Sequence, residues 1–214
     1  MAELLYQGHG SLRLTSAAGT VVYVDPYMDP TGAKGTSTYH VPADLILVTH
    51  QHYDHTATDL PERKEGCVVW ENFDMHPRRG EYLRRSLADV TVQATVAFNE
   101  NHPIDECVGY LVWMDGVLVY CAGDTSETRQ MSLSLSGMGI DYALLPGDGI
   151  YNMDVAAAAE CARVIGAKHN IPVHLKPVVP YGEEQAEEFA RLAPNPLLLR
   201  PGESLSLEGS GARP

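Results

Sequence analysis

The sequence has few basic residues, since 15 lysines and arginines stand against 28 aspartates and glutamates, which gives a formal net charge of −13. A field of that sign repels nucleic acid and anionic membrane surfaces, so neither is expected as a partner. A small anionic substrate stays compatible with this charge, because bound metal ions reverse the local sign. The partner that we expect is therefore a small-molecule substrate.

Segments that direct a protein to or across a membrane are lacking as well. The start of the chain, Met1 to Leu5, has neither a basic region nor a long apolar core, so we expect no signal peptide. No stretch approaches the length of a membrane span. The four cysteines lie in or beside apolar runs without a Cys-x-x-Cys pair, which favours buried, reduced thiols and a cytoplasmic location.

A serine nucleophile of the α/β-hydrolase type is not indicated either, because the sequence contains no Gly-x-Ser-x-Gly elbow. The chain has 214 residues, of which 44% are hydrophobic and 20% are charged. This length and composition are typical of a globular protein with a sizeable core. We therefore expect one domain that spans residues 1–214.

The most informative stretch is Thr49 to Thr56, in which three histidines and one aspartate fall within six consecutive residues. It follows an apolar run at residues 44–48 that is typical of a buried strand, so the cluster lies where a strand ends and a loop begins. A lone histidine is usually solvated or packed, but four ligand-type residues together favour a metal site. Imidazole and carboxylate are ligands that zinc, manganese and iron accept. The four side chains are His50, His52, Asp54 and His55.

Apolar and β-branched runs predict a chain of short strands and helices. Strands are expected at residues 3–7, 11–15, 20–25, 44–48, 67–71, 90–98, 107–114, 117–121, 140–145, 169–173 and within 197–207. Helical segments are expected at residues 59–66 as a short turn, and at 77–88, 126–136, 154–166 and 183–192. Residues 26–42 predict a long loop over one side of the site. The pattern indicates two mixed sheets face to face with helices outside, although a single doubly wound sheet would give the same pattern.

Three further ligand-type residues follow apolar strands later in the chain, namely His102, Asp124 and His174. Taken singly, they would be interpreted as a turn aspartate and two ordinary histidines. Taken together, they supply the additional ligands that a site for two ions requires, at strand ends on one edge of the sheets. Their convergence with the first cluster is therefore expected.

The whole pattern resembles the metallo-β-lactamase superfamily of metal-dependent hydrolases, whose signature is His-x-His-x-Asp-His. Within it, the chain is similar to the compact branch of ascorbate-6-phosphate lactonase-like proteins. The matching segments of the superfamily are Gly8-His9-Gly10-Ser11, Asp25-Pro26, His50-Gln51-His52-Tyr53-Asp54-His55, Gly123-Asp124-Thr125 and Pro172-Val173-His174. Those of the branch are Asn99 to Pro103, Asp124, Pro146 to Met153 and His174.

The resemblance implies a four-layer αββα sandwich of the α/β class and a site for two divalent metal ions. Zinc is the first choice for a histidine-rich ligand set, with manganese or iron close behind. The resemblance also implies two ligand sets that share a bridging Asp124, namely His50, His52 and His102, and Asp54, His55 and His174.

The activity implied is hydrolysis of an ester-type bond, in a lactone or a phosphorylated small metabolite. Two ions would hold a water between them and lower its pKa towards roughly 7, so that hydroxide is the nucleophile. Asp54 is the expected catalytic residue, because it would bind an ion and orient this water. The alternatives are a phosphodiesterase for a lipid or small nucleotide, a di-iron redox protein and a non-catalytic metal-binding relative. Di-iron redox relatives usually depend on a flavin domain, for which this chain has no room. A non-catalytic relative would be expected to have lost metal ligands, whereas the set of ligands here is complete.

Several other residues carry weaker expectations. His9 and Tyr151 are candidates for the acid that protonates the leaving group, although packing is the commoner role for each. His40 lies in the long loop and would line the pocket. His76 and His169 are expected to be solvated.

Two positions depart from the pattern of the resembling family. Gln51 stands where many relatives have glycine, and it should not touch the metals. Asp148 lies in the Gly147-Asp148-Gly149 turn, where relatives of this branch tend to be neutral. An additional carboxylate there would alter the charge preference of the pocket and put the identity of the substrate in doubt.

Overall fold

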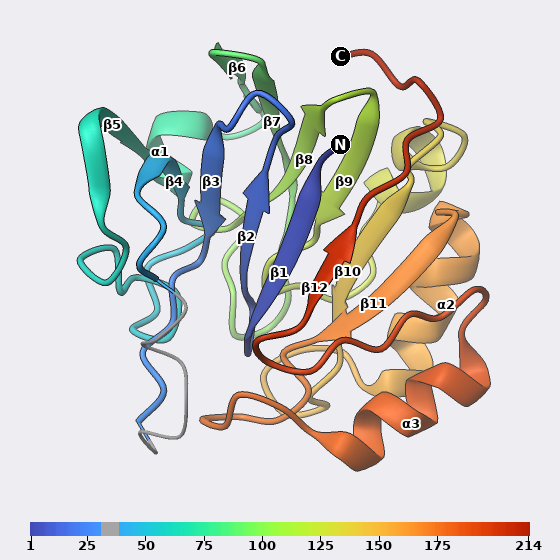
Figure 1. Cartoon of the computed structure of the whole chain (residues 1–214). Coiled ribbons are helices and arrows are strands. Elements are labelled where there is room, and N and C mark those ends of the chain that lie inside the picture. Colours follow the sequence, from blue (N-terminus) through green and yellow to red (C-terminus); the bar gives the residue numbers. More distant parts are fainter. Residues whose placement is uncertain (31–38) are drawn as a thin grey trace.

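The structure is a computed structural model in which residues 1–30 and 39–214 are described. Two six-stranded mixed sheets pack face to face (Figure 1). The first has the order β12-β1-β2-β3-β4-β5, with β1 at Glu3–Gly8, β2 at Ser11–Thr15, β3 at Val21–Val24, β4 at Ala43–Leu47, β5 at Arg63–Trp70 and β12 at Ser204–Ser206. The second has the order β11-β10-β9-β8-β7-β6, with β6 at Arg84–Leu87, β7 at Val90–Val96, β8 at Val108–Met114, β9 at Val117–Cys121, β10 at Tyr142–Pro146 and β11 at His169–Val173.

The two sheets follow the same plan. In the first sheet, β3, β4 and β5 are parallel neighbours and the other pairs are antiparallel. In the second sheet, β9, β10 and β11 are parallel neighbours and the other pairs are antiparallel. Parallel strands carry their carboxyl ends to one edge of a sheet, which is where ligands bind in such sheets. The loops after these strands therefore gather at one edge of the sandwich.

The core lies between the sheets and is built from alternate residues of each strand. In β3, Val22 and Val24 pack into the core between the sheets, whereas Val21 and Tyr23 lie on the outer face of the first sheet. All four side chains are buried. Because both faces of this strand are buried, its sequence is a continuous apolar run.

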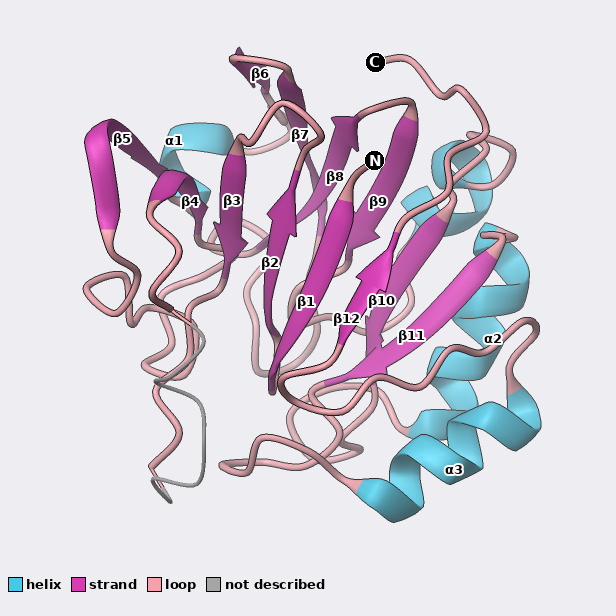
Figure 2. Ribbon diagram, in the orientation of Figure 1, coloured by secondary structure: helices cyan, strands magenta, loops and turns pink. Residues whose placement is uncertain are grey.

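Helices flank the second sheet (Figure 2), where α2 (Val155–Ile165), α3 (Glu183–Leu192) and a π-helical turn at Met131–Leu135 pack on its outer face. α2 begins after Asp154, whose carboxylate accepts a hydrogen bond from the Ala157 N–H at 2.8 Å, and it ends at Gly166 with φ 69°. The expected sandwich of two mixed sheets and flanking helices is confirmed. Over the outer face of the first sheet, Tyr39 and Leu60 pack on Tyr23 and its neighbours.

The helix predicted at residues 77–88 is wrong. Residues Arg84–Leu87 form strand β6 instead, which pairs with β7 through a two-residue turn at Ala88 and Asp89. Ala88 has φ 50°, as such hairpin turns require. The Arg84 guanidinium lies 5.1 Å from the ring centroid of Trp113, so contacts with the neighbouring strands outweigh the local helix propensity.

The start of β5 was also predicted wrongly. Residues 59–66 do not form a helical turn, since β5 begins at Arg63. It is followed by the short helix α1 (Asn72–Met75), which the sequence analysis did not anticipate. A capping box between Glu71 and Asp74 supports α1. Residues 31–38 of the predicted long loop lie outside the described residues. None of the described helices has the length and apolar character that crossing a membrane requires.

Candidate metal centre

The loops after β4, β7, β9 and β11 bring all the predicted ligands to one edge of the sandwich. Their donor atoms form overlapping groups in which all atoms lie within 4.8 Å of one another. The groups are His50, His52 and His102; His50, His55 and Asp124; and His9, Asp54, His55 and His174. The convergence that the sequence predicted is therefore present, and His9 joins it.

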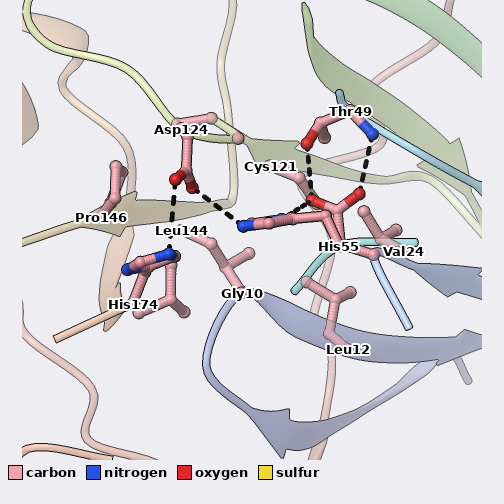
Figure 3. A pocket seen from close by; sticks show the side chains of 14 residues that line it. Gly10, Leu12, Val24, Thr49, His55, Cys121, Asp124, Leu144, Pro146 and His174 are labelled. Carbon is pink, nitrogen blue, oxygen red and sulfur yellow. Dashed lines mark hydrogen bonds and ion pairs between the residues drawn. The ribbon is translucent and has the colours of Figure 1, made fainter. Parts of the chain in front are cut away.

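Asp124 occupies the middle of this cluster and is buried. One carboxylate oxygen, Oδ1, lies 3.5 Å from Nε2 of His55. The other, Oδ2, lies 3.3 Å from Nε2 of His102 and 3.3 Å from Nε2 of His174. Figure 3 shows the carboxylate facing His55 and His174 across the space above Gly10. A single carboxylate thus faces histidines from three separate loops.

A tight turn before Asp124 gives it this position. Gly123 adopts φ 65°, which is the left-handed region that favours glycine. A Cβ atom at Gly123 would lie 2.6 Å from the Val108 carbonyl oxygen and 3.1 Å from Thr49 Cβ. Any side chain here would therefore push apart β8, β9 and the loop after β4.

The histidine nitrogens that face Asp124 lack other partners. The Nε2 atoms are buried and make no hydrogen bond with the described residues in four cases: His50, His55, His102 and His174. An unpaired buried polar atom costs roughly 1–3 kcal/mol, so such a concentration requires an explanation. Imidazole nitrogens directed at a shared space beside a buried carboxylate are the ligands that a divalent metal ion takes. The residues present therefore fit a metal centre.

Asp25 holds two of these histidines in the orientation that metal binding needs. Its Oδ2 accepts hydrogen bonds from His55 Nδ1 at 2.9 Å and from Thr49 Oγ1 at 2.7 Å, and its Oδ1 accepts one from Thr49 N at 2.7 Å. The Thr49 hydroxyl also lies 3.0 Å from His50 Nδ1. When Nδ1 donates, Nε2 keeps its lone pair for a metal. Asp25 therefore orients His55 directly and His50 through Thr49.

His102 is held in the same way from the loop after β7. Its Nδ1 lies 2.8 Å from Asn99 Oδ1, which leaves Nε2 directed at Asp124. Asn99 in turn donates to Asn152 Oδ1 at 3.2 Å, and Asn152 donates to Asp124 Oδ2 at 3.0 Å. The side chains behind the ligands are thus connected to one another, as is common around metal ions.

Asp148 supports His174 and does not face the substrate cavity. Its side chain is fully buried, and Oδ2 lies 2.9 Å from His174 Nδ1. Oδ1 accepts hydrogen bonds from the backbone N–H groups of Ile150, Tyr151 and Asn152. Burial opposes ionisation, but His174 and these donors lower the pKa of Asp148 to about 2. The prediction that Asp148 alters the charge preference of the pocket is wrong, because the turn folds its carboxylate inward.

The protonation of the cluster differs from residue to residue. Burial lowers the pKa of His174 and of His55, but Asp124 and the other neighbouring carboxylates outweigh burial, raising the pKa of His174 to about 10 and that of His55 above its ordinary value. Both imidazoles would therefore release a proton as a metal ion binds. Burial and the neighbouring His55 hold the pKa of His50 well below its ordinary value, so this imidazole is neutral. Burial works against ionisation of Asp124, but His174 and His55 outweigh it and hold its pKa well below the usual range. Neutral imidazole and ionised carboxylate are the forms that bind metal.

A cavity of about 250 Å³ opens above the cluster. Its floor contains four of the predicted ligands, namely His52, Asp54, Asp124 and His174. Ligand pockets usually measure roughly 300–1,000 Å³, so this one suits a small molecule. Tyr151, a candidate for the acid that protonates the leaving group, also lines the cavity.

Comparison with known proteins agrees with the site. The family model for the beta-lactamase superfamily domain matches residues 3–174, a range that contains every predicted ligand. The chain belongs to the metallo-β-lactamase superfamily. The predicted superfamily and fold are thereby confirmed.

Named relatives place the chain more closely within this superfamily. The UPF0173 metal-dependent hydrolase of Nitratidesulfovibrio vulgaris strain DP4 is 34% identical, over 97% of this chain and 96% of the relative. The UPF0173 metal-dependent hydrolase of Rubrobacter xylanophilus is 31% identical, over 95% of this chain and 96% of the relative. The structure of Igni18, a metallo hydrolase from Ignicoccus hospitalis, has a TM-score of 0.73 and 22% identity, and the match covers 97% of this chain and 98% of that one. At that identity, Igni18 supports the fold alone.

His9 has a position in this superfamily member that the sequence analysis did not foresee. It was considered as an acid for the leaving group, but its ring is fully buried. Its Nε2 lies 3.0 Å from Asp54 Oδ2. Its ring stacks on Tyr27, with centroids 4.6 Å apart, and contacts the tilted ring of His174, whose centroid is 3.7 Å away. His9 therefore fixes the Asp54 carboxylate. The sequence feature that pointed to a special role for His9 was the segment Gly8-His9-Gly10.

Other weak expectations have mixed outcomes. His40 does not line the cavity, because its side chain is 74% exposed and lies 3.4 Å from Glu62. His76 is not solvated, since it is buried and its ring stacks on Tyr82. Gln51 donates to Asn72 Oδ1 at 2.7 Å and so points to α1, away from the metal ligands, as predicted.

We expect Asp148→Asn to weaken metal binding by roughly 10–100-fold, the usual effect of removing a partner behind a ligand. The amide would lose the charge that orients His174 while keeping the size of the side chain. The measurement is a competition titration of Zn²⁺ against a coloured chelator. Asp154→Asn is the matched control, because asparagine caps a helix about as well as aspartate. Equal affinity in both variants would contradict the role of Asp148.

Proposed function

We propose that this protein is a hydrolase that uses two divalent metal ions to cleave an ester-type bond in a small molecule. The observation that carries the proposal is the set of unpartnered histidine nitrogens around the buried Asp124 carboxylate. When bound, the ions would polarise the substrate oxygen and lower the pKa of a water. Zinc is the expected metal, with manganese or iron as close alternatives. The proposed holders of one ion are His50, His52 and His102, and of the other Asp54, His55 and His174, with Asp124 shared.

Asp54 is the proposed catalytic residue. It lines the cavity, and His9 fixes its carboxylate from behind. Burial raises its pKa, but the neighbouring His174 and the hydrogen bond with His9 outweigh burial and hold the pKa below its ordinary value. At neutral pH it is therefore a carboxylate that can accept a hydrogen bond from the attacking water and take its proton.

The proposed substrate is a lactone or a phosphorylated metabolite, as in the ascorbate-6-phosphate lactonase-like branch that the sequence resembles. A phosphodiesterase acting on a lipid or small nucleotide is the alternative. The net charge of −13 supports a small-molecule substrate over nucleic acid or a membrane surface. The four cysteines are free, which supports the proposed cytoplasmic location.

The first test is elemental analysis of the protein purified without added metal. Close to two equivalents of metal per chain would support the site. No bound metal, with hydrolysis insensitive to a chelator, would refute it. A panel of lactones, phosphodiesters and phosphomonoesters then separates the proposed function from the phosphodiesterase alternative.

We expect Asp54→Asn to lower kcat on the preferred substrate by about 10²-fold or more, the scale of a lost general base. The amide cannot accept a proton from water, although it can keep the hydrogen bond to His9. Asp59→Asn is the matched control, since the Asp59 side chain is fully exposed five positions further on. Turnover by Asp54→Asn equal to that of the control would exclude the proposed role.

A further inference from the structure

The walls of the cavity differ in chemistry from its floor. The floor is ionic and carries the predicted ligands, whereas the walls are formed by Tyr53, Tyr151, Pro177 and Val178. Three of these side chains are large and unusually exposed for their type, at 72% for Tyr53, 50% for Tyr151 and 46% for Val178. Exposed apolar groups that surround a concave site mark a ligand-binding surface.

No lysine or arginine lines this cavity in the parts of the chain that the structure describes. A phosphate or carboxylate remote from the reacting bond would leave water without gaining a charged partner, and that is costly. An apolar group meets no such penalty here.

The walls are held in place by the rest of the fold. The Tyr27 hydroxyl donates a hydrogen bond to the Val178 carbonyl oxygen at 2.9 Å, and Val178 has φ 67°. A left-handed conformation is strained for a β-branched residue, and such strain is typical of functional sites. The Tyr151 N–H donates to Asp148 at 2.7 Å and the Tyr151 carbonyl accepts from Asn101 at 3.1 Å. The backbone is therefore held in place at both Val178 and Tyr151.

We propose that the substrate is an uncharged lactone or ester whose variable part is an alkyl or aryl group packed between Tyr53, Tyr151 and Val178. This inference rests on the proposed hydrolase function and narrows it, because it excludes a remote phosphate. In the reaction, the oxygen of water bonds to the carbonyl carbon and the ring C–O bond breaks. One proton of the water ends on the released alcohol, and the other leaves the new carboxylic acid for solvent, which gives a hydroxy-carboxylate.

The test compares lactones that share one ring, using the metal-loaded protein. The probes are δ-valerolactone, δ-decalactone with its pentyl chain, and an analogue whose chain ends in a carboxylate. One buried methylene is worth roughly fourfold, so partial burial of the pentyl chain predicts at least a tenfold higher kcat/KM for δ-decalactone than for δ-valerolactone. The carboxylate analogue is expected to be at least about tenfold poorer than δ-decalactone.

Variants test whether the cavity walls cause the preference for δ-decalactone. Tyr151→Ala is expected to lower the δ-decalactone to δ-valerolactone ratio of kcat/KM by about tenfold, because the ring that covers the chain is lost. Tyr151→Phe keeps the ring and is expected to keep the ratio, whereas a proton donated by the hydroxyl would show as an equal fall in kcat on both lactones. Phe73→Ala, at a half-exposed aromatic that does not line the cavity, is the control and keeps the ratio.

The outcomes separate the two proposals. Hydrolysis with a preference for δ-valerolactone or for the carboxylate analogue would overturn this inference and leave the proposed function standing. A metal-loaded protein that cleaves no ester of any class would overturn both. A Tyr53→Ala variant that changes a dimer into a monomer in light scattering, with the ratio unchanged, would show that the walls form an interface between copies and would also overturn the inference.

Discussion

Asp124→Asn is expected to lower kcat/KM by at least about 10³-fold and to leave the protein with fewer than two equivalents of metal. The shared carboxylate lies 3.3–3.5 Å from three histidine nitrogens, so its loss would affect both proposed ions. Metal ions contribute several kcal/mol to transition-state stabilisation, and each 1.36 kcal/mol is a factor of ten in rate. Steady-state kinetics and elemental analysis on the same preparation measure the two effects together.

The matched control for this prediction is Asp105→Asn. Asp105 is exposed and makes only a surface ion pair with Arg79 at 3.3 Å among the described residues, and such pairs contribute little to stability. It should therefore keep full activity and its metal. If Asp124→Asn retained two equivalents of metal and the activity of the control, the central place of Asp124 in the site would be refuted.

Removal of the metal is expected to lower the thermal midpoint by roughly 10 °C for each of the two proposed ions. An ion present at about a thousand times its dissociation constant stabilises the folded state by about 4 kcal/mol per site. For a chain of this size, 1 kcal/mol corresponds to roughly 2–4 °C. Scanning calorimetry before and after dialysis against a chelator measures the difference, and added Zn²⁺ should restore the original midpoint.

Two controls separate this effect from a general influence of cations. Mg²⁺ prefers oxygen ligands in octahedral geometry, so it should not restore the midpoint at the same concentration. His50→Ala should reduce the response to Zn²⁺, whereas His40→Ala, at an exposed histidine outside the cluster, should keep it. A midpoint that is the same with and without the chelator would contradict the metal centre.

The ligand cluster could be predicted from sequence because its information is local. His50 to His55 lie within one short loop, and the more distant ligands all follow apolar strands. Parallel strands deliver their carboxyl ends to one edge, so the position of Asp124 and His174 after apolar strands was enough to predict that they meet the cluster. The two capping residues of α2 were predictable for the same reason, since both signals lie within the helix ends.

The errors have a common physical origin in contacts between distant segments. Arg84 to Leu87 has the composition of a helix, but strand β7 and Trp113 determine its conformation. His9 resembles many packed histidines until the fold brings Asp54 to within 3.0 Å of it. Asp148 looked like a pocket residue because its inward orientation depends on three backbone donors and on His174, which is 26 positions later in the sequence.

The backbone hydrogen bond from His174 N to the His9 carbonyl oxygen, 2.8 Å long, joins the end of β11 in one sheet to the turn after β1 in the other. The two residues have φ 46° and 56°, so neither can form this bridge until its own turn has closed. In a growing polypeptide, the ligands after β4, β7 and β9 are all made before His174. The second proposed ion would be captured last, after both sheets have docked, and its presence would report that folding is complete.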